Sequence, residues 1–231
     1  MSIPTAADAQ LRELMRMFLT ENANINLSAL RTEEACWIGN IEDSLAYLDL
    51  NDSSSPHPRR GAAGCSYIDV GTGGGFPLLP LAVALPEARF TGLDTIRKKV
   101  DAIARIAKEL KLTNVETVAE RAEVLGRNTK HREQYDVVLS RAVAPLNVLL
   151  EYCSPFAKKD GLIVLWKSVH IEEELKQSER AQKLLACALI KQHRYELPSD
   201  FGPRQLLVFK KTAALPDEFP RKVGMPKKEP L

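Results

Sequence analysis

Long apolar stretches are missing from this sequence of 231 residues, and none reaches the roughly 20 residues that a helix needs to cross a bilayer. The opening residues, MSIPTAADAQLREL, lack the basic and then apolar pattern of a signal peptide. The four cysteines have neither the close pairs of a metal site nor the spacing of a disulfide framework: Cys36, Cys65, Cys153 and Cys187. The four histidines show no ligand spacing either. We therefore expect a cytoplasmic protein without a metal ion or a membrane segment.

Charge is nearly balanced, with a formal net charge of +2, but its distribution is uneven. From residue 204 onward, seven basic residues face only three acidic ones. A locally basic terminus is typical of proteins that bind phosphate backbones, and also of solvated tails. Charge alone therefore leaves nucleic acid open as a partner without requiring it.

The composition divides the chain into three parts. Residues 1–60 contain helical patterns over 8–19, 32–38 and 43–50, a cluster of asparagines, and a loop rich in serine and proline. We interpret this part as an N-terminal helical cap with a flexible loop. Residues 61–212 form the main domain, and residues 213–231, with four prolines, form a basic, extended C-terminal tail.

Strand and helix patterns alternate through the main domain. Apolar runs predict strands over 66–70, 89–94, 115–119, 135–140 and 162–167. Helical patterns cover 77–85, 96–111, 120–126, 142–154 and 171–190. Two further strand candidates, 192–197 and 205–210, close the domain. This order predicts an α/β fold with a seven-stranded, mostly parallel sheet, helices on both faces and an antiparallel edge.

The most informative stretch is a glycine-rich loop between the first strand and the first helix of this domain. Gly71, Gly73, Gly74 and Gly75 fall within five residues. A loop with so few side chains lets a ligand lie against the backbone at the start of a helix. Asp94 follows Gly71 by 23 residues, about the spacing that places a carboxylate beside a ribose. The stretch therefore predicts a nucleotide-like ligand.

The residues around the loop narrow the choice of ligand. No Gly-Lys-Ser/Thr element follows it, which counts against an NTPase. A dinucleotide fold would have a glycine where Phe76 stands. Asp69, the Gly71-x-Gly73-x-Gly75 run and Asp94 better suit S-adenosylmethionine (SAM), which presents a ribose, an adenine and an amino acid. With seven strands, these features resemble the Rossmann-like SAM-dependent methyltransferases.

The chemistry of the methyl acceptor is indicated by two missing motifs. Amino-group methylation commonly uses an Asn/Asp/Ser-Pro-Pro-aromatic motif after the fourth strand, where this chain has Ser140-Arg-Ala-Val. Methylation of a pyrimidine carbon needs a nucleophilic cysteine, and none of the four cysteines lies in a convincing site loop. An atom with a free lone pair, such as guanine N7, needs alignment but no general base.

Six motifs spread over nearly the whole chain point to one family: Asn24-Ile-Asn-Leu-Ser, Asp43-Ser-Leu, Asp69-Val-Gly-Thr-Gly-Gly-Gly-Phe-Pro, Arg121-Ala-Glu, Ser140-Arg-Ala-Val-Ala and Pro220-Arg-Lys-x-Gly-x-Pro. Together they resemble the RsmG (GidB) methyltransferases, which form 7-methylguanosine in the decoding-region loop of small-subunit (16S) ribosomal RNA.

The resemblance implies roles for individual residues. Catalytic roles fall to Arg141, at the mouth of the pocket, and to Lys167, which would reach the RNA or the guanine. SAM would be bound by Gly71, Gly73, Phe76, Asp94, Thr95, Ile96, Ala122, Glu123 and Arg141. RNA would be bound by Asn24, Asn26, Arg204, Arg221 and Lys222. The resemblance also implies ribosomal RNA or a ribosomal particle as partner, no metal, no membrane, and a monomer.

Two positions depart from the family pattern, and two other functions stay open. Asn40 stands where the family usually has a histidine, and Leu78 replaces the glycine that usually follows Phe-Pro. The first alternative is an NAD(P)-dependent oxidoreductase, which Phe76 disfavours. The second is a non-catalytic RNA-binding or ribosome-assembly protein on the same fold. Several site residues also have structural alternatives, such as helix capping for Asp94 and turn formation for Asn24 and Asn26.

Overall fold

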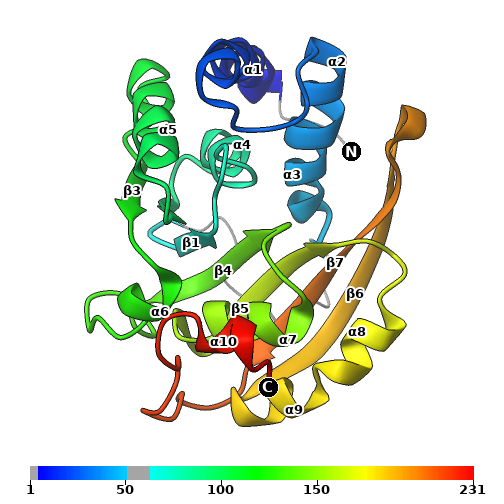
Figure 1. Ribbon diagram of the computed structural model, residues 1–231. Helices are drawn as coiled ribbons and strands as arrows, with labels where there is room; N and C mark the ends of the chain where they lie inside the picture. Colours follow the sequence, from blue (N-terminus) through cyan, green and yellow to red (C-terminus); the bar gives the residue numbers. More distant parts are fainter. Residues whose placement is uncertain (1–4, 51–62) are drawn as a thin grey trace.

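The computed structural model describes residues 5–50 and 63–231, which form three layers with a sheet between two groups of helices (Figure 1). The strands are β1 (Ser66–Val70), β2 (Arg89–Asp94), β3 (Val115–Ala119), β4 (Tyr135–Arg141), β5 (Ala157–Lys167), β6 (Cys187–Leu197) and β7 (Gly202–Lys211). Their order in the sheet is β3-β2-β1-β4-β5-β7-β6. The first five strands pair in parallel, and β7 is antiparallel to both β5 and β6. The predicted α/β fold with a mostly parallel, seven-stranded sheet is confirmed.

One face of the sheet is covered by the N-terminal helices together with two helices of the main domain (Figure 1). These are α1 (Thr5–Ile25), α2 (Glu33–Cys36), the π-helical η1 (Trp37–Glu42), α3 (Asp43–Leu45), the 3₁₀ helix η2 (Ala46–Leu50), α4 (Leu78–Ala84) and α5 (Arg97–Glu109). Along α1, Leu11, Leu14 and Phe18 recur at helical spacing and are fully buried. They share a hydrophobic cluster with Tyr67 of β1, so the N-terminal helices and the sheet have a common core.

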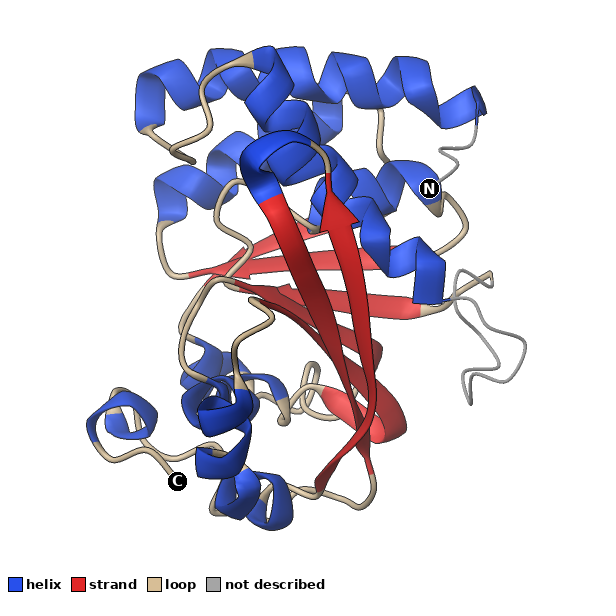
Figure 2. Cartoon of the chain, turned by 90° about the vertical axis from the view of Figure 1, so that its right-hand side faces the viewer, coloured by secondary structure: helices blue, strands red, loops and turns tan. Residues whose placement is uncertain are grey.

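The other face carries the later helices and the tail. These helices are α6 (Ala122–Leu125), α7 (Leu146–Cys153), α8 (Glu172–Gln177), α9 (Glu179–Leu184) and, in the tail, α10 (Met225–Lys228). Leu149 of α7, Phe209 of β7 and Phe219 of the tail belong to a second hydrophobic cluster. Figure 2, turned by 90°, shows the long strands β6 and β7 in front of the other strands of the sheet. No described helix is long and apolar enough to span a membrane.

The strand order places a topological switch point at β1. The chain runs from β1 through β2 to β3 on one side of this strand and then crosses back from β3 to β4 on its other side. In open parallel sheets, ligands bind beyond the carboxyl ends of the strands at such a point. The glycine loop directly follows β1, so the topology puts it at this position.

One predicted helix, over 171–190, is partly wrong. The structure has the two short helices α8 and α9, and the chain then enters β6 at Cys187. Ala186 has a left-handed backbone, with φ of 52°, which ends the helical run. The apolar segment after it pairs with β7, so it belongs to a strand although its composition alone suits either element.

The remaining predictions differ less from the structure. Thr32, at the start of the helical pattern over 32–38, caps α2, because its hydroxyl accepts the backbone N–H of Ala35. The predicted flexible loop falls almost entirely on residues 51–62, which lie outside the described residues. The tail was expected to be extended throughout, whereas the structure has the short helix α10, which follows Gly224 in a left-handed conformation with φ of 82°.

Candidate active site

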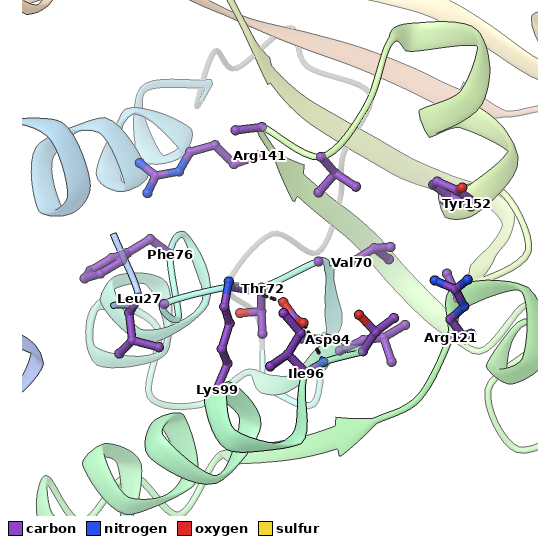
Figure 3. A pocket seen from close by; sticks show the side chains of 18 of the residues that line it. Leu27, Val70, Thr72, Phe76, Asp94, Ile96, Lys99, Arg121, Arg141 and Tyr152 are labelled. Carbon is purple, nitrogen blue, oxygen red and sulfur yellow. Dashed lines mark hydrogen bonds between the residues drawn. The ribbon is translucent and has the colours of Figure 1, made fainter. Parts of the chain in front are cut away.

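A cavity of about 500 Å³ opens at the carboxyl ends of β1, β2 and β4 (Figure 3). A cavity of this size suits a cofactor-sized ligand. The structure brings all nine predicted cofactor-binding residues to its lining: Gly71, Gly73, Phe76, Asp94, Thr95, Ile96, Ala122, Glu123 and Arg141. Their contact with SAM stays a prediction.

Two glycines of the loop have backbone conformations that disfavour side chains on the cavity wall. Gly71 has φ of +76°, and a Cβ there would lie 2.5 Å from Cγ2 of Val143. Gly73 also has a left-handed backbone, with φ of +55°. Residues with a Cβ rarely adopt this conformation. The loop therefore presents backbone to whatever occupies the cavity.

Asp94 joins the glycine loop to the start of α5 (Figure 3). Its Oδ2 accepts the N–H of Gly73 at 2.9 Å, and its Oδ1 accepts the N–H of Ile96 at 2.9 Å. The second bond reaches the N–H of Ile96, the N-cap residue of α5, and no described side chain caps this helix, so the alternative role of Asp94 as a helix cap is wrong. An ionised carboxylate accepts about four hydrogen bonds in total. Asp94 therefore keeps capacity for ribose hydroxyls.

Asp69, on β1 just before the loop, is a buried carboxyl group. It is 0% exposed, and neither of its oxygens has a hydrogen-bond partner among the described residues. Burial raises its pKa from 3.8 to about 7. The Thr72 hydroxyl, which is also buried and without a partner there, lines the cavity. Asp69 itself is not among the residues that line the cavity, so a ligand there meets the Thr72 hydroxyl and not this carboxyl group.

Arg141, at the end of β4, is held on the opposite rim of the cavity. Its Nη1 donates to Oδ2 of Asp43 and to the carbonyl of Gly39, both at 2.8 Å. Its Nη2 donates to Oδ1 of Asn40 at 2.8 Å. Its guanidinium also lies 5.7 Å from the centre of the Phe76 ring. Asn40 therefore supplies an oxygen acceptor at the position where the family usually has a histidine.

Asp43 is itself fixed by residues from the far end of the chain. Its Oδ1 accepts the Tyr195 hydroxyl, and its backbone carbonyl accepts the indole N–H of Trp166 at 2.8 Å. Burial raises the pKa of Tyr195 well above its ordinary value, so the phenol stays protonated and donates. Trp166 is 5% exposed, as expected of a core residue. The Asp43-Ser-Leu motif thus orients Arg141.

Lys167, the second predicted catalytic residue, lies outside the cavity lining. Its Nζ donates to the carbonyl of Ala144 at 3.0 Å and pairs with Glu174 of α8 at 2.9 Å. Ala144 belongs to the loop that carries Val143, which does line the cavity. Lys167 therefore supports the cavity rim from outside, and its approach to RNA stays a prediction.

The two N-terminal asparagines predicted to bind RNA have local contacts. Asn24 donates to the carbonyl of Thr20, one turn earlier in α1. Asn26 has φ of 53° and accepts a hydrogen bond from Arg31. Turn formation therefore describes Asn26, and RNA contact stays a prediction for both. The asparagine that organises this loop is Asn22, which is 2% exposed and bonds Ser28 through both its amide oxygen and its amide nitrogen.

The three basic residues predicted to bind RNA differ in their exposure and in their partners within the protein. Lys222 is exposed. Arg204, near the start of β7, is half-buried and donates to the carbonyl of Pro203. Arg221 is bound to Glu151, with its Nη2 2.6 Å from Oε2. The side chain of Arg221 therefore has a structural partner inside the protein.

The side chains that line the cavity without having been predicted as site residues include Lys99 of α5 and Tyr152 of α7. Lys99 lies five residues after Asp94, in the first turn of the helix that starts at the cavity, and this position is a usable signal. Tyr152 comes from a helix of the opposite face, and no local pattern marks it. Within residues 5–50 and 63–231, no group of three or more His, Cys, Asp or Glu side chains is arranged to hold a metal ion.

Comparisons with known proteins agree with this geometry. Residues 7–197 match the family model described as rRNA small subunit methyltransferase G. A ribosomal RNA small subunit methyltransferase G from Carboxydothermus hydrogenoformans is 39% identical over 94% of this chain and 88% of that protein. One from Alkaliphilus oremlandii is 40% identical over 97% of this chain and 92% of that protein.

Solved structures support the fold. The crystal structure of M. jannaschii TYW2 in complex with AdoMet has a TM-score of 0.53 at 17% identity, and the match covers 74% of each chain. A ribosomal protein L11 methylase from Lactobacillus delbrueckii subsp. bulgaricus has a TM-score of 0.53 at 13% identity, over 76% of this chain and 79% of that one. The family match does not favour the oxidoreductase alternative. The chain belongs to the rRNA small subunit methyltransferase G family.

Proposed function

We propose that this enzyme transfers the methyl group of SAM to N7 of a guanine in small-subunit (16S) ribosomal RNA, in the decoding-region loop. The observation that carries the proposal is the meeting, in one cavity, of a glycine-rich loop, a carboxylate at the end of β2 and an arginine at the end of β4. Family membership supplies the reaction class.

The cavity offers a partner for each part of SAM. The backbone of Gly71 and Gly73 lies open to the ligand. Asp94, with Thr95 and Ile96 beside it, would hold the ribose hydroxyls. Ala122 and Glu123 would flank the adenine.

The protein supplies alignment. When bound, SAM provides an electrophilic methyl group, which guanine N7 accepts through its free lone pair without a general base. The purine gains positive charge in the transfer, so Arg141 orients the reactants and does not stabilise the developing charge. Asp43 and Asn40 fix the direction of its guanidinium, and alignment of this kind accounts for a large part of the rate in such reactions.

RNA would be held around the cavity mouth. We assign this role to Lys167, Arg204, Arg221, Lys222, Asn24 and Asn26. Arg221 gives its Nε and Nη2 to Glu151, which leaves Nη1 for a phosphate. Each phosphate contact makes affinity for RNA fall as salt rises. We also propose a cytoplasmic, monomeric enzyme, since its substrate is ribosomal RNA or a ribosomal particle.

Two measurements test the proposal. Calorimetry with SAM and with NAD(H) should show binding of SAM alone. Mapping of ribosomal RNA after deletion of the gene should show that one 7-methylguanosine is lost from the small-subunit RNA. Unchanged 7-methylguanosine would defeat the proposal, and RNA binding without SAM binding would favour the non-catalytic alternative.

A further inference from the structure

The C-terminal tail is bound to the helical face of the sheet by arginine side chains and buried rings. Phe219 is 4% exposed. Arg132 donates to the Phe219 carbonyl at 2.7 Å, and Arg127 donates to the Pro220 carbonyl at 2.6 Å. Both arginines belong to the segment between α6 and β4. This attachment brings residues 219–224, here called the tail segment, onto α6 and α7.

The strongest contact of the tail segment joins Arg221 to Glu151 of α7. Oε1 of Glu151 accepts the backbone N–H and the Nε of Arg221 at 2.8 and 2.9 Å, and Oε2 accepts Nη2 at 2.6 Å. Glu151 is 0% exposed. A carboxylate with so little access to water depends on these donors. Glu151 is the residue directly before Tyr152, which lines the cavity.

A second contact joins the tail segment to the cavity wall itself. The backbone N–H of Gly224 donates to Oε1 of Glu123 at 2.9 Å. Glu123 lies in α6, is 4% exposed, and lines the cavity. Figure 1 shows the tail turning beneath α6 before α10 lies against α7. The tail segment therefore binds both helices that form this side of the cavity.

We propose that the tail segment fixes the adenine side of the SAM pocket, with Arg221 and Gly224 as positioning residues. The inference rests on the proposed function, in which Ala122 and Glu123 flank the adenine. Arg221 holds α7 next to Tyr152, and Gly224 holds the side chain of Glu123. Neither of the two contacts involves RNA, so this role of Arg221 is separate from its predicted phosphate contact.

The physical basis is that each contact satisfies a buried carboxylate. Loss of the Arg221 side chain leaves Glu151 charged and buried, or forces it toward water, and either result moves α7. The N–H of Gly224 is available because its backbone adopts φ of +82°, which a residue with a Cβ rarely does. A ligand that needs the ordered wall binds less tightly when the wall is loose, and by the same linkage its binding orders the tail segment.

The first test compares SAM affinity, measured by calorimetry without RNA, for the wild-type protein and three variants. Arg221→Met keeps the length of the side chain and removes its donors, and we expect the SAM dissociation constant to rise roughly 5- to 100-fold, the usual range for linked sites. Arg221→Lys keeps the charge, so its SAM dissociation constant should lie between those of the wild type and Arg221→Met. Lys227→Met removes an equal charge from an exposed position of α10 and should bind SAM as the wild type does.

The second test uses the wild-type protein. It therefore tests the role of the tail segment even where Arg221→Met fails to fold. Hydrogen exchange of residues 219–226 should slow when SAM is added, while the β6–β7 turn around Asp200 should be unaffected. Provided that the wild-type protein binds SAM, either of two results would overturn the inference. The first is that folded Arg221→Met binds SAM as tightly as the wild type, and the second is that SAM leaves hydrogen exchange in the tail segment unchanged. Absence of SAM binding by the wild type would defeat the proposed function, and the inference with it.

Discussion

The guanidinium of Arg141 lies 2.8 Å from the carboxylate of Asp43, and the pair joins the end of β4 to the N-terminal helices. The side chains of both residues are largely buried, at 18% and 8% exposure. Tyr195 of β6 completes the arrangement by donating to the second oxygen of Asp43. Three distant segments of the chain therefore determine where one arginine points.

Replacement of Asp43 should disturb catalysis through Arg141. Asp43→Asn keeps the shape of the side chain and removes the charge that holds the guanidinium, so we expect kcat/KM for methyl transfer to fall roughly 10- to 100-fold. The matched control is Asp49→Asn, an exposed aspartate of η2. Equal activity of the two variants, with both folded at the assay temperature, would show that Asp43 does not orient Arg141.

The glycine loop allows a comparison of two alanine substitutions. Gly71 and Gly64 both have left-handed backbones, with φ of +76° and +79°, but a Cβ meets Val143 only at Gly71. Gly64→Ala should cost about 1 kcal/mol of unfolding free energy through backbone strain alone. Gly71→Ala should cost more and should also weaken SAM binding, because the loop has to move. Urea unfolding and calorimetry measure the two effects, and equal behaviour would argue against a close-fitting loop.

Asp69 should make stability depend on pH in a defined direction. Burial raises its pKa from 3.8 to about 7, so the folded state keeps a proton that the unfolded state loses. The stability that this group contributes is full below about pH 4 and is lost as the pH rises toward 7. Asp69→Asn should therefore be more stable than the wild type at pH 8, by up to roughly 4 kcal/mol, with a smaller difference at pH 5. A difference that does not grow with pH would contradict the assignment.

Lys167 should affect RNA and not SAM. It lies outside the cavity lining, next to the loop that carries Val143. We expect Lys167→Met to leave the SAM dissociation constant within about twofold and to raise KM for RNA several-fold, since phosphate and base contacts are lost. Lys176→Met, an exposed lysine on the neighbouring α8, serves as the control. A large loss of SAM affinity in the Lys167 variant would place this lysine in the cofactor site instead.

The sequence was sufficient to predict the parts of the fold that rest on local patterns. The sequence pattern predicted β1 to β4 within one residue of their observed bounds. The central strands β1 and β4 are largely apolar because both faces of the sheet are covered there, whereas the edge strand β3 is only partly buried. An apolar run also led to the wrong helix prediction over 184–190, where the run continues from a helix into a strand. Only the pairing of β6 with β7 decides between the two.

The candidate site shows the same limit. Gly71 follows β1, while Asp94 and Arg141 end β2 and β4, the two neighbours of β1 in the sheet, so the topology alone brings them together. The partners of Arg141 could not be predicted, since Asp43 lies 98 residues away. The tail is a similar case, because its basic composition suggested phosphate binding, whereas the Arg221 side chain reaches a buried glutamate 70 residues earlier. Composition shows that a segment is basic, but it does not show which group each basic side chain binds.

The measurement that tests the central claim most directly is the transfer of a labelled methyl group from SAM to small-subunit ribosomal RNA that lacks the modification. This RNA is offered in two forms, as bare RNA and within intact subunits. The account predicts that label appears in at least one of the two substrates, as 7-methylguanosine at a single position of the decoding-region loop, and that Asp43→Asn slows its appearance. Label on another atom or base, or no label in either substrate from a protein that binds SAM, would contradict it.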